Sequence, residues 1–234
     1  MSLNMLMLSS SKVGEGKYLE QPKPLIIEHL KSIKDVLFVP YAGVAVTWND
    51  YTDKVQSALP EFAIKGIHQY ANPKQAIEQA SAIMIGGGNT FNLLAELYNN
   101  DLIEAIKNRV KQGIAYVGWS AGSNICGLSI KTTNDMPIVQ PASFAALSLI
   151  NVQLNPHYTN YVTPGHNGET RDQRINEFCV LEPTVSVIGI QEGSAILLKD
   201  NKATLVGDRD GVVFKGTNKT TLASNRDISA LCFA

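Results

Sequence analysis

Short apolar runs alternate with longer segments of helical spacing through the first half of the chain. The runs are typical of buried strands, because each is followed by turn-forming residues. They lie at residues 6–8, 36–39, 64–67, 82–85 and 113–118, and the helical segments lie at 22–33, 48–59, 73–80, 91–98 and 102–112. This alternation predicts an α/β fold with a doubly wound, mostly parallel sheet and helices on both faces.

The last third of the chain has a different pattern, in which short apolar runs are separated by turns. They lie at residues 185–190, 195–198, 203–206 and 212–214. We expect antiparallel additions at the edge of the main sheet. No linker, repeat or low-complexity stretch divides the sequence, which favours a single domain over residues 1–234.

The strand predicted at 113–118 runs into Gly-Trp-Ser-Ala-Gly at 118–122, and a helix can follow. Gly-x-Ser-x-Gly between a strand and a helix is typical of a nucleophile elbow, where small neighbours allow a sharp bend that exposes the serine Oγ. Ser120 is therefore a candidate nucleophile, and the N–H of Ala121, at a helix start, is a candidate oxyanion donor. A glycine-rich turn with an incidental serine is the alternative.

The strand at 82–85 ends in Gly-Gly-Gly-Asn-Thr. This stretch lacks the spacing of a dinucleotide-binding loop and the Lys-Ser/Thr of a phosphate loop. Ligands of parallel sheets gather at the carboxyl ends of strands, where Ser120 also lies. We therefore favour an oxyanion loop with Gly88 as donor, and Asn89 as a substrate-binding residue beside it.

A serine nucleophile needs a histidine base and a group that orients it. Of the four histidines, His29 and His68 fall on a helix and at a strand end, where packing is the simpler role. His157 follows Asn-Pro at the end of an apolar run, 147–154, that we expect to be a strand. His166 lies in a polar loop, and the residues alone allow either as the base.

Two carboxylates could orient that base. Asp135 lies in a polar stretch, 132–137, within an otherwise apolar region, although an Asx turn before proline is a simpler role for it. Glu192 follows the run at 185–190. The order Ser120, Asp135, His157 matches one class of triad, but triads occur in several orders.

Composition excludes several classes of function. The chain has 234 residues, 44% hydrophobic and 18% charged, with a net charge of −1. The absence of a basic run argues against nucleic acid or an anionic membrane as partner. No apolar stretch is long enough to span a membrane, and the N-terminus lacks the basic region of a signal peptide.

The three cysteines, Cys126, Cys179 and Cys232, are odd in number and widely spaced. This usage favours free thiols in the cytoplasm and gives no metal-ligand spacing. We therefore expect neither a metal nor another cofactor. The polar loop at 165–174 contains Arg171, whose planar fork suits a substrate carboxylate, although a solvated helix start is the commoner reason for such a loop.

Five stretches, in order along the chain, resemble the S51 serine peptidases of the peptidase E type. They are Gly-Gly-Gly-Asn-Thr-Phe (86–91), Gly-Trp-Ser-Ala-Gly (118–122), Thr-Thr-Asn-Asp-Met-Pro (132–137), Asn-Pro-His (155–157) and Gly-Glu-Thr-Arg (168–171). The resemblance covers nearly the whole chain and is weakest beyond residue 200. Two positions depart from the family pattern: Ser123, where alanine is usual, and Asn167, where lysine is usual.

The resemblance implies a metal-independent α-aspartyl dipeptidase whose fold is similar to that of class I glutamine amidotransferases. The nucleophile then falls on Ser120, the histidine on His157 and the third member on Asp135, with Glu192 as an alternative. Candidate substrate-binding residues are Arg171, His166 and Asn89. The expected partner is a small Asp-X peptide, and the expected state is a monomer or small homo-oligomer.

Overall fold

The structure, a computed structural model, describes residues 3–165 and 167–233. Seven strands form its larger sheet: β1 (Asn4–Leu8), β2 (Asp35–Val39), β3 (Ala63–Gly66), β4 (Ala82–Ile85), β5 (Ala115–Trp119), β8 (Ser194–Lys199) and β9 (Lys202–Gly207). Their spatial order is β3-β2-β4-β5-β1-β8-β9. The first five are parallel, while β8 and β9 extend the edge in antiparallel pairing. The predicted sheet is thus confirmed as large and mostly parallel.

Helices cover both faces of this sheet, as predicted. One face packs against α1 (Lys23–Leu30) and α2 (Trp48–Ala58), and the other against α3 (Pro73–Gln79), α4 (Thr90–Asn99) and α5 (Ile103–Lys111). In β1, Leu6 and Leu8 belong to the hydrophobic core on the side of α1 and α2, and Met5 and Met7 belong to the core on the side of α3, α4 and α5. Successive strand side chains point to opposite faces, so two buried faces require strands that are apolar throughout.

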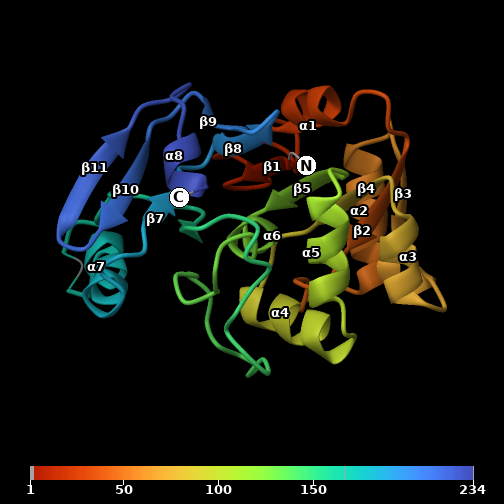
Figure 1. Cartoon of the computed structure of the whole chain (residues 1–234), viewed down its shortest axis with the longest axis horizontal. Helices are drawn as coiled ribbons and strands as arrows, with labels where there is room; N and C mark the ends of the chain where they lie inside the picture. The colour runs from red at the N-terminus through yellow and green to blue at the C-terminus, as the bar shows by residue number, and fades with distance from the viewer. Residues whose placement is uncertain (1–2, 166, 234) are drawn as a thin grey trace.

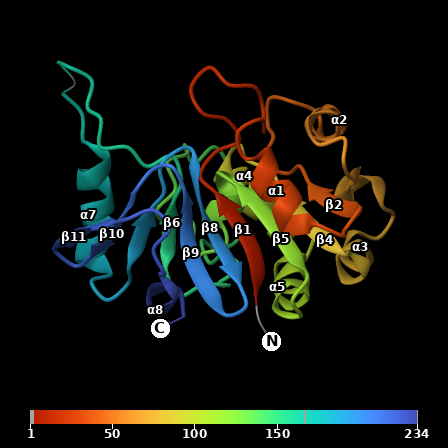
Figure 2. The ribbon, with the colours of Figure 1, turned by 90° about the horizontal axis from the view of Figure 1, so that it is seen from above.

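A second, four-stranded sheet lies at the end of the molecule away from α3 (Figures 1 and 2). Its members are β6 (Gln153–Asn155), β7 (Val187–Gly189), β10 (Gly211–Lys215) and β11 (Asn218–Leu222), in the order β11-β10-β7-β6. The helix α7 (Arg171–Leu181) packs against β10. The short helix α8 (Ser229–Cys232) lies against β9.

This arrangement corrects two predictions. Of the C-terminal runs, only those in β8 and β9 join the main sheet edge, because β7 and β10 pair with each other in the second sheet. The strand expected at 147–154 is reduced to the short β6. The preceding residues form no ladder, since the N–H groups of Leu147 and Leu149 donate to the carbonyls of Ile125 and Cys126 beside the elbow.

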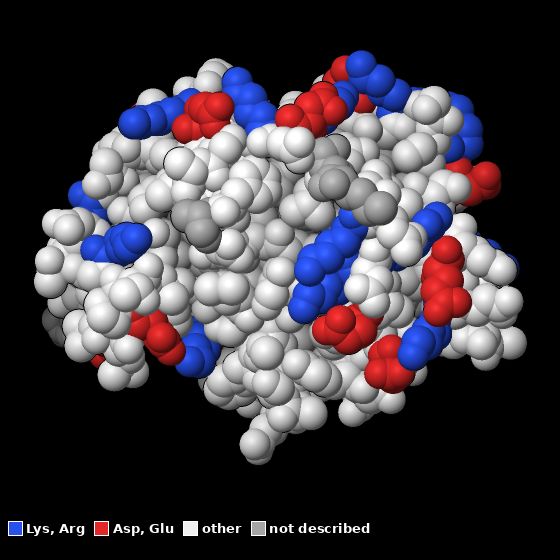
Figure 3. Space-filling model, viewed as in Figure 1, with Lys and Arg blue, Asp and Glu red and all other residues white. Residues whose placement is uncertain are grey.

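The surface adds little to the choice of partner. On the face shown in Figure 3, positive and negative side chains are interspersed, mostly toward the periphery. Within the described ranges, no helix has the length and apolar character needed to cross a bilayer.

Candidate active site

Ser120 lies at a sharp bend between β5 and the short helix α6 (Ala121–Asn124). Its φ is +53°, which is strained for a residue with a side chain. The bend favours glycine on both sides of the serine, and close backbone contacts also leave no room there for a side chain. A Cβ on Gly118 would lie 2.4 Å from the carbonyl oxygen of Gly122, and one on Gly122 would lie 2.1 Å from that of Ile85. The predicted elbow geometry is therefore present.

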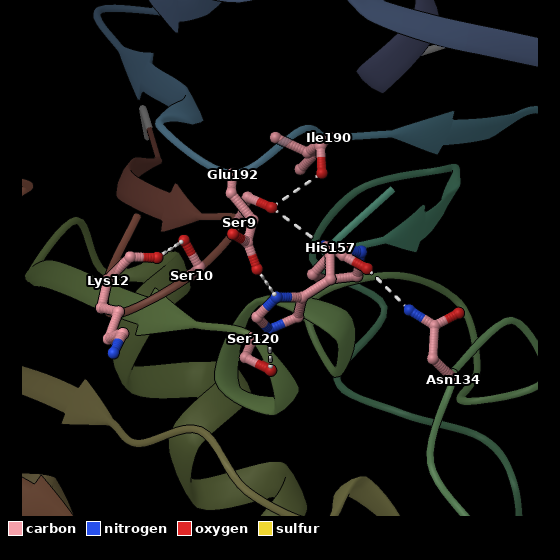
Figure 4. Close-up of polar contacts among 9 residues, drawn as sticks. Ser9, Ser10, Lys12, Ser120, Asn134, His157, Ile190 and Glu192 are labelled. Atoms are coloured by element: carbon pink, nitrogen blue, oxygen red, sulfur yellow. Dashed lines mark hydrogen bonds and ion pairs between the residues drawn. The ribbon is translucent and has the colours of Figure 1, made fainter. Parts of the chain in front are cut away.

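His157 connects the serine to a carboxylate (Figure 4). Its Nε2 lies 2.9 Å from Ser120 Oγ, and its Nδ1 lies 2.7 Å from Glu192 Oε1. The backbone also fixes the ring, because the N–H of His157 donates to Ser9 Oγ at 2.9 Å, and that hydroxyl donates to the carbonyl of Ile190. Ser9, just beyond β1, thus links the main sheet to the loops after β6 and β7.

The preference for Asp135 as the orienting acid is corrected by this geometry. One oxygen of its carboxylate, Oδ2, accepts from Thr90 N at 2.7 Å, Thr90 Oγ1 at 2.5 Å and Thr133 Oγ1 at 3.1 Å. These donors hold Asp135 at the N-terminus of α4, where a negative charge is favoured. The alternative that the sequence left open, Glu192, is the carboxylate hydrogen-bonded to His157.

The glycine loop after β4 packs directly on the elbow. A Cβ on Gly87 would lie 3.0 Å from Ser120 Cβ, and Tyr51 donates to the Gly87 carbonyl at 2.8 Å. Gly88 has a φ of +139°, and a Cβ there would lie 2.1 Å from the carbonyl oxygen of Ala42. The N–H groups of Gly88 and Ala121 have no hydrogen-bond partner among the described residues. Both can therefore face an anion.

Asn89 is engaged within the protein. Its Oδ1 accepts from the N–H of Asn92 as the N-cap of α4, and its Nδ2 donates to the carbonyl of Met136 at 2.9 Å. This bridge ties the loop around Asp135 to the glycine loop. His166, another predicted substrate-binding residue, lies outside the described residues.

Ser120 and His157 border two cavities. The smaller, of about 120 Å³, is also lined by Thr133, Asp135 and Arg171, whereas the larger, of about 560 Å³, extends toward α2. Arg171 is half-buried and has no hydrogen bond or ion pair within the described part of the chain. Burial lowers its pKa, as does the neighbouring Arg174, while Asp135 raises it.

Sequence reasoning missed two groups of this site. Ser9 is one of three consecutive serines, and only its place after β1 could have indicated a role. Tyr51 and Lys54 lie on α2 and border the larger cavity. The stretch 51–54 also resembles the family, but its helical spacing is that of any surface helix and indicated no role for either residue. In the part of the chain that the structure describes, no group of three or more His, Cys, Asp or Glu side chains could hold a metal ion.

The comparisons with known proteins identify the family of this chain. A model of peptidase family S51 matches residues 5–206. The chain belongs to peptidase family S51. Two proteins named peptidase E are similar along the whole length. That of Shewanella amazonensis is 50% identical over 99% of this chain and 100% of its own, and that of Shewanella denitrificans is 51% identical over 98% and 99%.

Solved structures support the fold of this S51 peptidase. A putative peptidase E from Listeria monocytogenes has a TM-score of 0.66 at 23% identity, covering 89% of this chain and all of its own. A peptidase from an acI-B1 actinobacterium has a TM-score of 0.70 at 16% identity, covering 97% of each chain. The family resemblance is confirmed, and the protein is a hydrolase that cleaves peptide bonds.

Proposed function

We propose that this S51 peptidase is a metal-independent serine dipeptidase for substrates with an N-terminal aspartate. The observation that carries the proposal is the line from Ser120 through His157 to Glu192, beside a small cavity that contains the Arg171 guanidinium, which is unpaired among the described residues. The first feature supplies a nucleophile and the second a receptor for a carboxylate.

The geometry supports an acyl-enzyme mechanism. His157 Nε2 accepts the Ser120 proton as Oγ attacks the scissile carbonyl, and Glu192 keeps the other ring nitrogen protonated and oriented. The N–H groups of Gly88 and Ala121 stabilise the oxyanion of the tetrahedral intermediate. His157 then gives its proton to the leaving amine, and water hydrolyses the aspartyl ester on Ser120 by the same steps.

The smaller cavity favours aspartate over longer or neutral side chains. Its volume of about 120 Å³ limits it to a short side chain. Arg171 supplies two parallel donors for the β-carboxylate, which would otherwise be costly to bury. Asp135 has its Oδ1 without a hydrogen-bond partner among the described residues, so it can accept from the substrate α-ammonium. An N-terminal aspartate carries both groups on one residue.

The remaining expectations belong to this proposal. We infer that the reaction needs no metal, since the serine elbow and the two N–H groups perform the tasks that a metal would otherwise perform. We also retain the relation to class I glutamine amidotransferases, which carry cysteine at the elbow. We further propose that the enzyme acts in the cytoplasm as a monomer or small homo-oligomer.

A panel of dipeptides tests the proposal. The purified protein should hydrolyse Asp-Leu in the presence of EDTA and leave Glu-Leu and Ala-Leu nearly intact, because a small displacement of the carbonyl costs about 10²-fold. Ser120→Ala should lower kcat by on the order of 10⁶, as loss of a triad nucleophile does in subtilisin. A Ser120→Ala protein with a tenth of the original activity would exclude the mechanism.

The carboxylate receptor is tested in the same assay with two arginine variants. Arg171→Met should lower kcat/KM for Asp-Leu by roughly 10²- to 10³-fold, or about 3–4 kcal/mol, while a small activated ester is hydrolysed normally. Arg174→Met is the matched control, since Arg174 is exposed and pairs with Glu169 at 3.7 Å. Equal effects of the two substitutions would show that the receptor lies elsewhere.

A further inference from the structure

The larger cavity beside Ser120 has no part in the recognition of aspartate proposed above. It is bordered by the loop at 42–46, by Tyr18 and by two residues of α2, Tyr51 and Lys54. At about 560 Å³ it has room for a whole amino-acid residue. Because the smaller cavity takes the aspartate side chain, the residue after the scissile bond must enter this larger space.

Lys54 presents an unpaired positive charge at this cavity. Its Nζ lies 4.3 Å from the centroid of the Tyr18 ring, a cation–π contact that holds the ammonium group without neutralising it. Within the described residues it has no carboxylate partner. Seven of the other fourteen lysines form ion pairs in the structure, so the lack of a carboxylate partner alone does not distinguish Lys54. Lys54 is distinguished by its place, because it lines the same cavity as Ser120.

Hydrogen bonds connect the support of Lys54 to the oxyanion loop. Tyr18 donates to the hydroxyl of Tyr51 at 3.3 Å, and Tyr51 donates to the carbonyl of Gly87 at 2.8 Å. Tyr51 and Lys54 are three residues apart on α2 and therefore share one face of the helix. The ammonium group is thus held in a fixed relation to the N–H of Gly88, which would hold the scissile carbonyl.

We propose that Lys54 binds the free α-carboxylate of the leaving residue and so favours dipeptides over blocked or longer peptides. In a dipeptide this carboxylate is one residue away from the scissile carbonyl, and where the leaving side chain is uncharged it is the only anion on the leaving side. The inference rests on the proposed function, since it takes the aspartate to occupy the smaller cavity.

The rim of the cavity fits an apolar side chain on the leaving residue. Val44, Val46 and Ile138 border it and are 56%, 39% and 57% exposed. Adjacent exposed apolar side chains are typical of ligand sites. A leaving leucine would cover them while its carboxylate faces Lys54, so the cavity accommodates both ends of the residue.

The test compares Asp-Leu with its amide, Asp-Leu-NH₂, which lacks the carboxylate. Wild type should prefer the acid by about three- to tenfold in kcat/KM, the effect of one exposed charge-assisted contact. Lys54→Met should abolish this preference by raising KM for Asp-Leu alone, with kcat unchanged. Lys54→Glu should reverse it. Lys65→Met is the matched control, because Lys65 lies over the Tyr70 ring at 4.2 Å, away from the site.

The outcomes separate this inference from the proposed function. If wild type cleaves the acid and the amide equally, or if Lys54→Met weakens both substrates equally, the carboxylate contact is refuted and the dipeptidase stands. If wild type cleaves neither, the proposed function fails and the inference fails with it. If only the preference for the acid disappears in Lys54→Met and not in Lys65→Met, the contact is established.

Discussion

Glu192 and Asp135 each bring a carboxylate near the Ser120–His157 pair, but their surroundings suit different tasks. Glu192 lies 2.7 Å from His157 Nδ1, and the two side chains are 44% and 39% exposed. Asp135 is instead held by Thr90 and Thr133 at the start of α4. A carboxylate on the imidazole stabilises the imidazolium that forms during attack, whereas one beside Arg171 acts on the substrate.

The two tasks predict different kinetics. Glu192→Gln should lower kcat by on the order of 10² to 10⁴ for both Asp-Leu and a small activated ester, because the histidine loses its orienting charge. Asp135→Asn should mainly raise KM for Asp-Leu and leave the ester unaffected, because the ester has no α-ammonium. Steady-state kinetics on the two substrates measure both effects. If Asp135→Asn impaired the ester as Glu192→Gln does, Asp135 would belong to the catalytic machinery.

At the scale of elements, the sequence predicts well those segments whose pattern is long or chemically distinctive. The parallel strands β1 to β5, the helices α1 to α5 and the elbow follow from apolar runs, helical spacing and Gly-x-Ser-x-Gly. The polar strand β11, Asn-Lys-Thr-Thr-Leu, is mostly exposed and has no apolar pattern to reveal it. The short β6 is positioned by the loop packed beneath the elbow, which local periodicity does not encode.

The pairing of His157 with Glu192 depends on how β6 pairs with β7, which the sequence did not predict. β6 and β7 are parallel neighbours, with Asn155 opposite Gly189, so residues just beyond their carboxyl ends lie side by side. His157 and Glu192 are two and three residues beyond that matched pair. Asp135 precedes β6 in a loop, and the family resemblance, rather than its place in the sequence order, favoured it. The partner of the histidine was therefore a question of strand register rather than of motif.

Two adjacent residues of α6 test how closely the elbow is packed. Gly122→Ala should lower the free energy of unfolding by at least about 2 kcal/mol and abolish activity, because its Cβ would lie 2.1 Å from the Ile85 carbonyl oxygen on β4. Ser123→Ala should cost about 1 kcal/mol and leave kcat/KM within about threefold. The single Ser123 hydroxyl proton is shared between the carbonyls of Leu8 and Gly118, at 2.7 and 2.9 Å from Oγ. Without it the Leu8 carbonyl still accepts from Ser120 N.

Urea unfolding and Asp-Leu hydrolysis measure the two α6 variants side by side. A Gly122→Ala protein with wild-type stability would mean that β4 and α6 can separate without cost. A Ser123→Ala protein without activity would mean that the hydroxyl positions the elbow. The second result would be unexpected, because alanine is the usual residue at this position in the family.

At the scale of the whole molecule, a histidine far along the chain from the active site couples stability to pH. The side chain of His29 on α1 contacts the sheet, where its Nε2 lies 3.1 Å from the carbonyl oxygen of Tyr116 on β5. Its Nδ1 is buried and has no hydrogen-bond partner in the described structure. Burial lowers the pKa of His29 to about 4, although the Tyr116 carbonyl partly opposes the shift. The ring is therefore neutral in the folded protein at neutral pH.

The sign of the effect follows from proton binding. In the unfolded chain His29 has a pKa near 6.5, so between about pH 6.5 and pH 4 the unfolded state binds more protons, and stability falls as the pH falls. With a pKa of about 4 in the folded state, the loss from this residue is at most about 3 kcal/mol at 1.36 kcal/mol per pKa unit.

His29→Gln, whose amide can still donate to the Tyr116 carbonyl, should remove this loss. Urea unfolding at pH 7.5, 5.5 and 4.5 should thus show the variant gaining on wild type as the pH falls. His68→Gln is the matched control: the pKa of His68 is also lowered by burial, but its ring reaches the exposed Asn49, so this variant should keep the larger share of the wild-type pH dependence. Parallel stability curves for wild type and His29→Gln would show that the ring takes up a proton in the folded state, and that α1 moves away from β5 to admit it.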